Sequence, residues 1–378
     1  MDERNEVVVS APEGAVLQYG GQAVIEGVMM RSARYFAVAC RKPDGTIVTQ
    51  REEVDKSIIG KLKWLNKPFL RGTLALVDAM ALGTRALAFA SNIQMEAEYT
   101  RQQAGKKPTP GVPQQPPTPL QEEVVAISAS LAQGTPVVVP EKTPSKSKIN
   151  DIAIGGTIVS SFVFGIGLFV LVPTLLTGFL HRHGLVSAAN PHAATTLNLV
   201  DGLIRMILFF GYIALISFMP QIQRVFQYHG AEHKAINTLE AGLPLSGANA
   251  LRASRIHPRC GTSFIFIVLV INLLVFAVLP RPVWYLRFPM HLAVIPLVAG
   301  IAYEVIKFAG KYRRYPLVMA VFAPGMATQL LTTREPDADQ VEVALAALYA
   351  VLEAEGHLRP ADLSAATPDP EEPAAALA

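Results

Sequence analysis

Four long apolar blocks constrain the fold of this 378-residue chain more than any other feature. About 20 consecutive apolar residues are enough to cross a bilayer, and each block is close to that length or longer. A soluble protein can bury one such helix in its core, but hardly four. The sequence therefore predicts a mainly helical, multi-pass membrane protein of about four spans, at residues 152–180, 206–222, 263–280 and 288–308.

The composition agrees with a membrane protein and argues against other classes. Only 17% of the residues are charged, against about 25% in typical soluble domains. The net charge is +3 and no basic run is interleaved with aromatic residues, so we expect membrane lipid as a partner and no nucleic acid. Two cysteines are too few for a disulfide scaffold, and the charged N-terminus does not resemble a cleavable signal peptide.

Basic residues predict the orientation of the spans. Cytoplasmic loops carry an excess of lysine and arginine. The stretch between the second and third spans holds five basic residues, whereas the loops after the first and third spans hold one and two. This pattern predicts a protein of the cell membrane with both termini in the cytoplasm.

Outside the spans we expect two soluble elements and two segments without regular structure. The N-terminal element is a small α+β unit on the cytoplasmic side, with three strands and an Asp44-Gly45 hairpin signal. A helix near the C-terminus opens with a proline and an acidic first turn. The predicted regions are a β-meander with a long amphipathic helix (1–100), a Pro-rich linker (101–148), the membrane domain (149–335), an amphipathic helix (336–356) and a disordered tail (357–378).

The long N-terminal helix, expected over residues 69–99, could itself enter the membrane. Its charged residues Arg71, Asp78 and Arg85 recur every seven positions, so they share one side of a helix. Three charges favour an interfacial or core position over a fifth span.

A polar stripe lies between the second and third spans. On a helix, positions i, i+3 and i+4 share one side, and His229, Glu232 and His233 occupy them. Two imidazoles one turn apart can bind one zinc-sized ion. The order H-x-x-E-H reverses the H-E-x-x-H motif, in which the glutamate polarises metal-bound water. We therefore expect His229 and His233 to bind a divalent metal, with zinc as the candidate, and Glu232 to act as the catalytic base.

Further metal ligands are expected from two other segments. His257 and Cys260 stand three apart just before the third span, and both side chains can bind metal. Glu304 lies in the fourth span, where an ionisable residue is costly and by default a functional suspect. The predicted topology places all three near the cytoplasmic boundary. The alternative for Glu304 is a salt bridge with Lys307, one helical turn on.

Several ordered segments resemble the YqhQ-like family of bacterial membrane proteins: GGQAVIEGVMMRS, YHGAEHKAIN, HPRCGTSF, LTTREP and the Tyr303-Glu304 pair. They are spread over most of the chain outside the linker and the tail. The resemblance implies a bacterial inner-membrane location. It also implies a family of unknown function that has been described as predicted metal-dependent enzymes, with no established substrate or catalytic residues.

We favour a membrane-embedded metal-dependent hydrolase with its site at the cytoplasmic boundary. The ion would lower the pKa of a bound water, and Glu232 would take the proton. The bond cleaved could be a peptide, a phosphoester or a lipid ester. A purely structural alternative assigns no ion to the polar stripe. The stripe would instead hold the N-terminal element through hydrogen bonds, with His229 paired to Glu26.

A non-enzymatic membrane transporter or scaffold is the other alternative. A transporter would use Glu304, Lys307 and an Asp201–Arg205 pair as a buried polar path. Four spans without a repeat are few for a secondary transporter, unless the chain forms a homo-oligomer. A scaffold would use the N-terminal sheet to bind other proteins.

Overall fold

The computed structural model describes residues 19–54, 71–104, 156, 160–161, 163–186, 193–312 and 315–358. Most of the linker expected at 101–148, the start of the first expected span and nearly all of the tail expected at 357–378 lie outside the described residues. The chain divides into two units, and the elements discussed below belong to the unit that holds residues 1–97 and 168–378, except for the last turns of α2 and the first residue of η2.

The N-terminal element is an antiparallel sheet of four strands: β1 (Gly20–Val24), β2 (Gly27–Arg31), β3 (Tyr35–Arg41) and β4 (Ile47–Glu53). Each strand pairs with the next one in the chain. The sheet has one strand more than predicted, because Ile25 and Glu26 form a tight turn between the paired residues Val24 and Gly27. Glu26 has a φ of 50°, in the left-handed region that such turns require.

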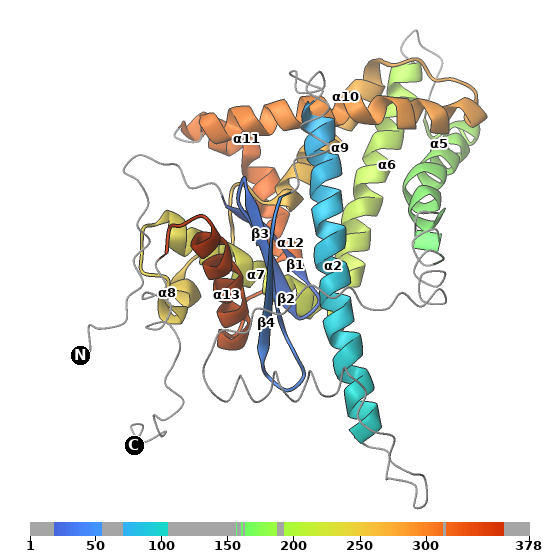
Figure 1. Cartoon of the computed structure of the whole chain (residues 1–378). Helices are drawn as coiled ribbons and strands as arrows, with labels where there is room; N and C mark the ends of the chain where they lie inside the picture. Colours follow the sequence, from blue (N-terminus) through green and yellow to red (C-terminus); the bar gives the residue numbers. More distant parts are fainter. Residues whose placement is uncertain are drawn as a thin grey trace, which may run out of the picture. The chain divides into compact units, whose positions relative to one another are not determined.

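Helices form most of the remaining described chain and confirm the mainly helical class (Figure 1). They are α2 (Arg71–Ala104), the π-helix η2 (Gly167–Leu171), α5 (Val172–Arg182), α6 (Ala193–Ile216), α7 (Pro220–Glu240), α8 (Gly247–Arg252), α9 (Gly261–Val278), α10 (Trp284–Lys311), α11 (Pro316–Ala327), α12 (Gln329–Thr332) and α13 (Ala338–Ala354).

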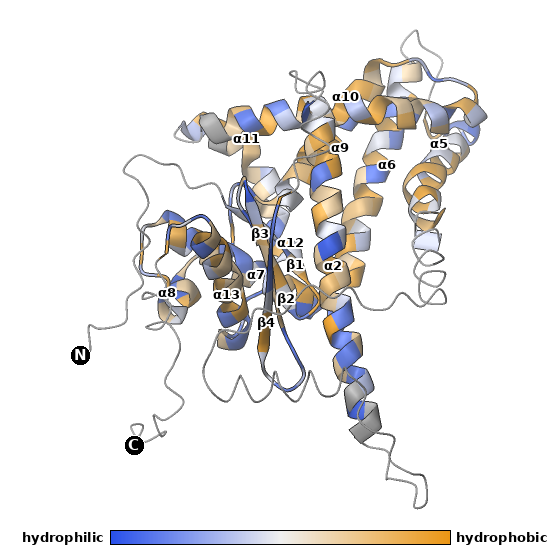
Figure 2. Ribbon diagram, viewed as in Figure 1, coloured by the Kyte–Doolittle hydropathy of each residue, from blue (hydrophilic) through white to orange (hydrophobic). Residues whose placement is uncertain are grey.

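Five stretches of the described helices are long and apolar enough to cross a membrane. Four of them correspond to the predicted spans, and the fifth is in α2. Figure 2 shows apolar residues over much of α5 and α6. The second span begins at Ala193 rather than Met206. Asp201 and Arg205 lie one turn apart in α6 and pair at 2.9 Å, so the charges that limited the predicted block do not end the helix.

Helix α2 packs against one face of the sheet. Its residues Leu82, Ala86 and Ala90 are buried in a core that they share with the strands. The start of α2 instead approaches α10, where a Cβ on Gly72 would lie 2.6 Å from the carbonyl oxygen of Ala299. The core position agrees with the expectation from the three charges of this helix. The helix is also long and apolar enough to be a fifth candidate span.

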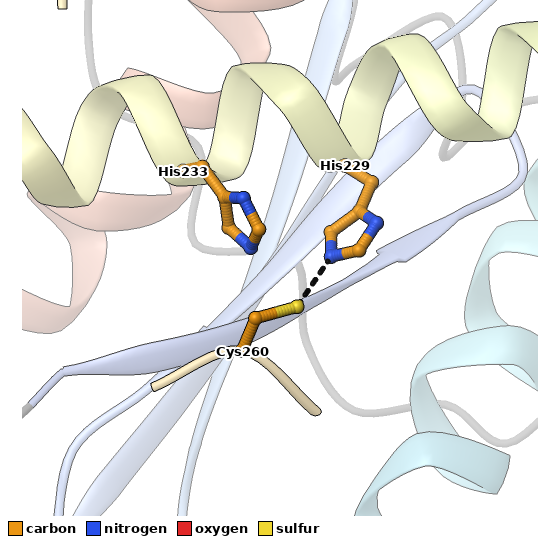
Figure 3. A group of neighbouring side chains, drawn as sticks. All are labelled: His229, His233 and Cys260. Atoms are coloured by element: carbon orange, nitrogen blue, oxygen red, sulfur yellow. Dashed lines mark hydrogen bonds between the residues drawn. The ribbon is translucent and has the colours of Figure 1, made fainter. Parts of the chain in front are cut away.

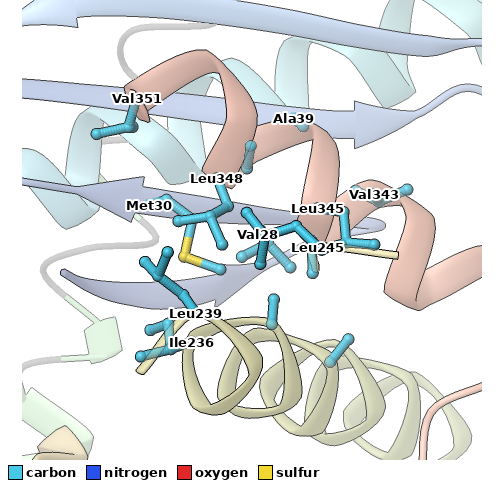
Figure 4. Close-up of a cluster of buried hydrophobic side chains, with 14 of the residues drawn as sticks. Val28, Met30, Ala39, Ile236, Leu239, Leu245, Val343, Leu345, Leu348 and Val351 are labelled. Carbon is cyan, nitrogen blue, oxygen red and sulfur yellow. The ribbon is translucent and has the colours of Figure 1, made fainter. Parts of the chain in front are cut away.

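Helices α7 and α13 cover the other face of the sheet (Figure 1). Alternate strand residues point to opposite faces, so Val28 and Met30 enter this core while Met29 faces α2. Figure 4 shows side chains from the sheet, α7 and α13 meeting there, with Ile236 from α7 and Leu348 from α13 among them. This core fixes the position of α7, the helix that carries the histidine stripe.

Candidate metal centre

Helix α7 begins and ends at residues suited to those positions. Pro220 occupies its first turn, where the missing N–H costs nothing, and Gly242 follows its end with a φ of 67°. In between, Gly230 allows a close crossing, because a Cβ there would lie 2.1 Å from the carbonyl oxygen of Arg334. This crossing brings the chain after α12 alongside the histidines.

Three potential ligand atoms converge beside α7. His229, His233 and Cys260 each offer one atom, and these atoms all lie within 4.8 Å of one another. Figure 3 shows both imidazole rings pointing from α7 toward the Cys260 side chain. The Nε2 of His229 lies 3.2 Å from the Cys260 Sγ. Three of the predicted ligands therefore lie close together: two come from α7 and one comes from another segment. We call these three residues the His-His-Cys cluster.

Backbone carbonyls orient both imidazole rings. The Nδ1–H of His229 donates to the Thr332 oxygen at 2.8 Å, and that of His233 donates to the Arg255 oxygen at 2.6 Å. These bonds fix the tautomer and leave both Nε2 lone pairs directed at the cluster, as is usual for metal-binding histidines. The His233 Nε2 is buried and has no hydrogen-bond partner among the described residues. The arrangement suits coordination of a cation.

Cys260 lies at the N-cap of α9 and is buried. Its Sγ accepts a hydrogen bond from the Thr262 N–H at 3.4 Å and lies 3.1 Å from the Thr262 hydroxyl. The position at the start of α9 therefore directs this sulfur, a potential zinc ligand, toward the two imidazoles.

Glu232 lies beside the cluster without belonging to it. Its side chain is only 4% exposed, and burial raises its pKa against the opposing effects of His229, His257 and a hydrogen bond from the Gly21 backbone. Its Oε2 is buried without a hydrogen-bond partner in the described chain. Gly21 makes room for this carboxylate, since a Cβ there would lie 2.9 Å from Oε1.

Two further predicted ligands, His257 and Glu304, are not among the converging atoms. The Nε2 of His257 lies 3.3 Å from the Glu240 carboxylate, and Glu240 also pairs with Arg259. Glu304 accepts two hydrogen bonds from the Arg71 guanidinium, at 2.7 and 2.5 Å. The structure thus places an ion pair at Glu304 with an arginine of α2, a partner that the sequence did not indicate.

The pairing of His229 with Glu26, the structural alternative, is not present. Glu26 instead accepts hydrogen bonds from Arg224 and, at 3.3 Å, from the Tyr228 hydroxyl. The imidazole of His229 is directed to Thr332 and Cys260. A hydrogen bond between the sheet and the stripe therefore does not explain this histidine.

An apolar pocket adjoins the cluster. It encloses about 350 Å³ together with its mouth. Thr262 and Thr332, which contact Cys260 and His229, form its polar edge. The other lining residues come from α6, α9 and α11–α12: Phe209, Phe210, Ile213, Ile265, Phe266, Thr328 and Leu331.

Sequence reasoning missed the groups that position these side chains. They are the carbonyls of Arg255 and Thr332, which orient the two histidines, and the close approach of Gly21 to Glu232. The paired glycines of GGQAV and the segment LTTREP contain two of these positions, but backbone contacts between segments so far apart leave no spacing pattern in a single sequence.

Comparison with known proteins identifies relatives without an assigned activity. The profile of a family described as "Protein of unknown function (DUF1385)" matches residues 67–354. The chain is 34% identical over 341 residues to the "Uncharacterized protein YqhQ" of Bacillus subtilis (strain 168), covering 89% of this chain and 93% of that protein. No solved structure matches significantly. Because both matches cover most of the chain, it belongs to the DUF1385 family of YqhQ-like proteins.

Proposed function

We propose that this protein is a metal-dependent hydrolase that binds a divalent ion, zinc, through His229, His233 and Cys260. The convergence of two imidazole nitrogens and one sulfur within 4.8 Å carries the proposal. Imidazole and thiolate ligands favour zinc over magnesium or calcium, which prefer oxygen. Three protein ligands also leave one position of a tetrahedral site open, as in catalytic zinc centres.

Glu232 is the group that we assign to proton transfer. A bound zinc ion lowers the pKa of a coordinated water toward neutrality. Glu232 lies on the same side of α7 as both histidines, and this supports its assignment as a carboxylate beside that centre. Its unpartnered Oε2 is available to accept a proton. The Gly21 N–H hydrogen bond and the surrounding buried side chains would hold the carboxylate in position.

The adjoining apolar pocket favours a substrate with an apolar chain. Its walls belong to α6, α9 and α12, and the first two are candidate membrane spans. Such a chain would reach the pocket from lipid and present its polar bond at the threonine edge. A lipid ester or an apolar peptide fits this arrangement better than a soluble phosphoester does.

Metal content and hydrolysis test the two parts of the proposal separately. The purified full chain should carry about one zinc ion per molecule, and the His229→Ala, His233→Ala double variant should carry almost none. His183→Ala, which removes an exposed histidine of the described chain, is the matched control. Equal metal content in the double variant and the control would refute the metal site.

Glu232→Gln tests the catalytic assignment. It should keep the metal but lose hydrolysis about 10²-fold or more, because general-base catalysis is removed. The assay uses a panel of lipid esters and apolar peptides with the wild-type protein as reference. A metal-loaded wild type that cleaves no member of the panel would instead support a structural metal site in a scaffold protein.

A further inference from the structure

A second polar site lies among the membrane helices, away from the His-His-Cys cluster. A cleft of about 380 Å³, mouth included, is lined by residues of α5, α6, α9 and α10 and of the connection between α9 and α10. Its lining includes three arginines, Arg205, Arg281 and Arg287. We call it the arginine cleft.

The arginine cleft and the metal centre lie at opposite ends of α9. Cys260 caps the start of this helix, whereas Phe276, near its end, lines the cleft. At 1.5 Å per residue, the two positions are separated by about 24 Å along the helix axis. The cleft is therefore a separate site, and its role does not depend on the proposed hydrolase.

Positive charge in the arginine cleft exceeds negative charge. Asp201 is the only carboxylate among the described residues that line it, and it pairs with Arg205 at 2.9 Å. Arg281 donates to the neutral Asn198 side chain at 3.0 Å. Arg287 donates from Nε to the Pro282 carbonyl at 3.1 Å. The described lining thus holds three guanidinium groups against one carboxylate.

Arg205, which lines the cleft, also has an unused donor. This residue is 8% exposed, and its Nε is buried without a hydrogen-bond partner in the described part of the chain. One terminal nitrogen serves both Asp201 and the His291 Nε2, at 2.9 and 3.1 Å. A buried donor left unpaired costs free energy, which an acceptor entering the cleft would recover.

We propose that the arginine cleft binds the phosphate group of an anionic ligand. Guanidinium groups match phosphate oxygens in planar, charge-assisted hydrogen bonds. Arg281 and Arg287 supply the uncompensated charge, and the Arg205 Nε supplies a desolvated donor. A lipid headgroup at the membrane boundary and free inorganic phosphate share this chemistry.

The test compares these two sources in the purified full chain. One arm embeds the protein in nanodiscs of phosphatidylcholine, alone or mixed equally with phosphatidylglycerol, and measures retained lipid by native mass spectrometry. The other arm titrates inorganic phosphate against the protein in neutral detergent and follows the unfolding temperature. Enrichment of phosphatidylglycerol identifies a lipid ligand, and stabilisation by phosphate alone identifies a free anion.

Variants connect binding to the cleft. Arg281→Gln and Arg287→Gln should each weaken binding about tenfold or more, whereas Arg281→Lys, which keeps the charge, should weaken it less. Arg252→Gln removes an exposed arginine of α8 and is the matched control. Arg287 makes a single bond to the backbone, so its replacement also tests the proposal if Arg281→Gln does not fold. Binding of neither ligand, or equal binding by Arg287→Gln and Arg252→Gln, would overturn the proposal.

Discussion

At the scale of residues, the hydrogen bond at Nδ1 of each imidazole determines that Nε2 is the atom available to bind a metal. Spacing along α7 was enough to predict that His229 and His233 share a side, because helix geometry is local. The carbonyls that orient the rings come from Arg255 and Thr332, which no local rule connects to them. The sequence therefore indicated which side chains could bind a metal, but not how their rings are oriented.

The two predicted ligands outside the cluster illustrate the same limit. His257 is directed to Glu240 across a loop, and Glu304 accepts from Arg71, which is 233 residues away. Which carboxylate pairs with which base depends on how α2 packs against α10. Residue type, spacing and approximate membrane depth do not separate these residues from Cys260.

Thiol chemistry should distinguish the two cysteines. Burial raises the pKa of Cys40 to about 12, so its reactive thiolate is scarce at neutral pH and alkylation of the folded chain should be very slow. Cys260 should be alkylated after a chelator removes the metal and protected when zinc is restored. Peptide mass spectrometry after iodoacetamide treatment measures both sites. Alkylation of Cys260 that is unaffected by the chelator would argue against a metal–sulfur bond.

At the scale of elements, α7 is the support of the candidate metal centre. The sheet and α13 bury its apolar side, while its histidines face the chain before α9 and after α12. The amphipathic pattern predicted this helix and the strand pattern predicted a meander. The turn at Ile25 and Glu26 escaped prediction because Glu26, which is not a glycine, adopts a positive φ. The early start of α6 escaped prediction because the charges of Asp201 and Arg205 pair inside the apolar helix. The core position of α2 was one of the expected alternatives, but its partner, the sheet, depends on packing between separate segments of the chain.

Gly230 tests how closely the chain must cross α7. The Gly230→Ala change would place a Cβ 2.1 Å from the Arg334 carbonyl oxygen, so backbone would have to move. We expect a loss of about 1–3 kcal/mol in the free energy of unfolding and weaker zinc binding, because Thr332 lies in the displaced segment. Denaturant unfolding and zinc titration measure the two effects.

Gly247→Ala is the control for this change, since a Cβ at Gly247 meets nothing within 4 Å. It should leave both stability and zinc affinity nearly unchanged. Similar behaviour of the two variants would mean that the crossing at Gly230 does not constrain the site.

At the scale of the whole molecule, α6 and α9 each contribute residues to two sites of different chemistry, one near each end of α9. The His-His-Cys cluster and the apolar pocket lie where α9 begins, and the arginine cleft lies where it ends. An 18-residue apolar helix is about 27 Å long, close to the thickness of the hydrocarbon core. The two sites would then face opposite sides of the membrane.

Cysteine accessibility tests this arrangement. Ser254→Cys lies on the loop before α9, and Val283→Cys lies just before α10, where Val283 is 51% exposed. The positive-inside pattern predicts that a membrane-impermeant thiol reagent labels Val283→Cys in intact cells and Ser254→Cys only after permeabilisation. The native cysteines are buried and serve as background. Labelling of both positions from one side would exclude a crossing by α9.

X-ray absorption at the zinc edge reports directly on the atoms that bind the ion. The purified, zinc-loaded chain should show two nitrogen scatterers from protein near 2.0 Å and one sulfur near 2.3 Å. The Cys260→Ser variant should lose the sulfur shell and keep the nitrogens. A wild-type spectrum with oxygen ligands only, or an unchanged sulfur shell in the Cys260→Ser variant, would contradict a zinc ion bound by His229, His233 and Cys260.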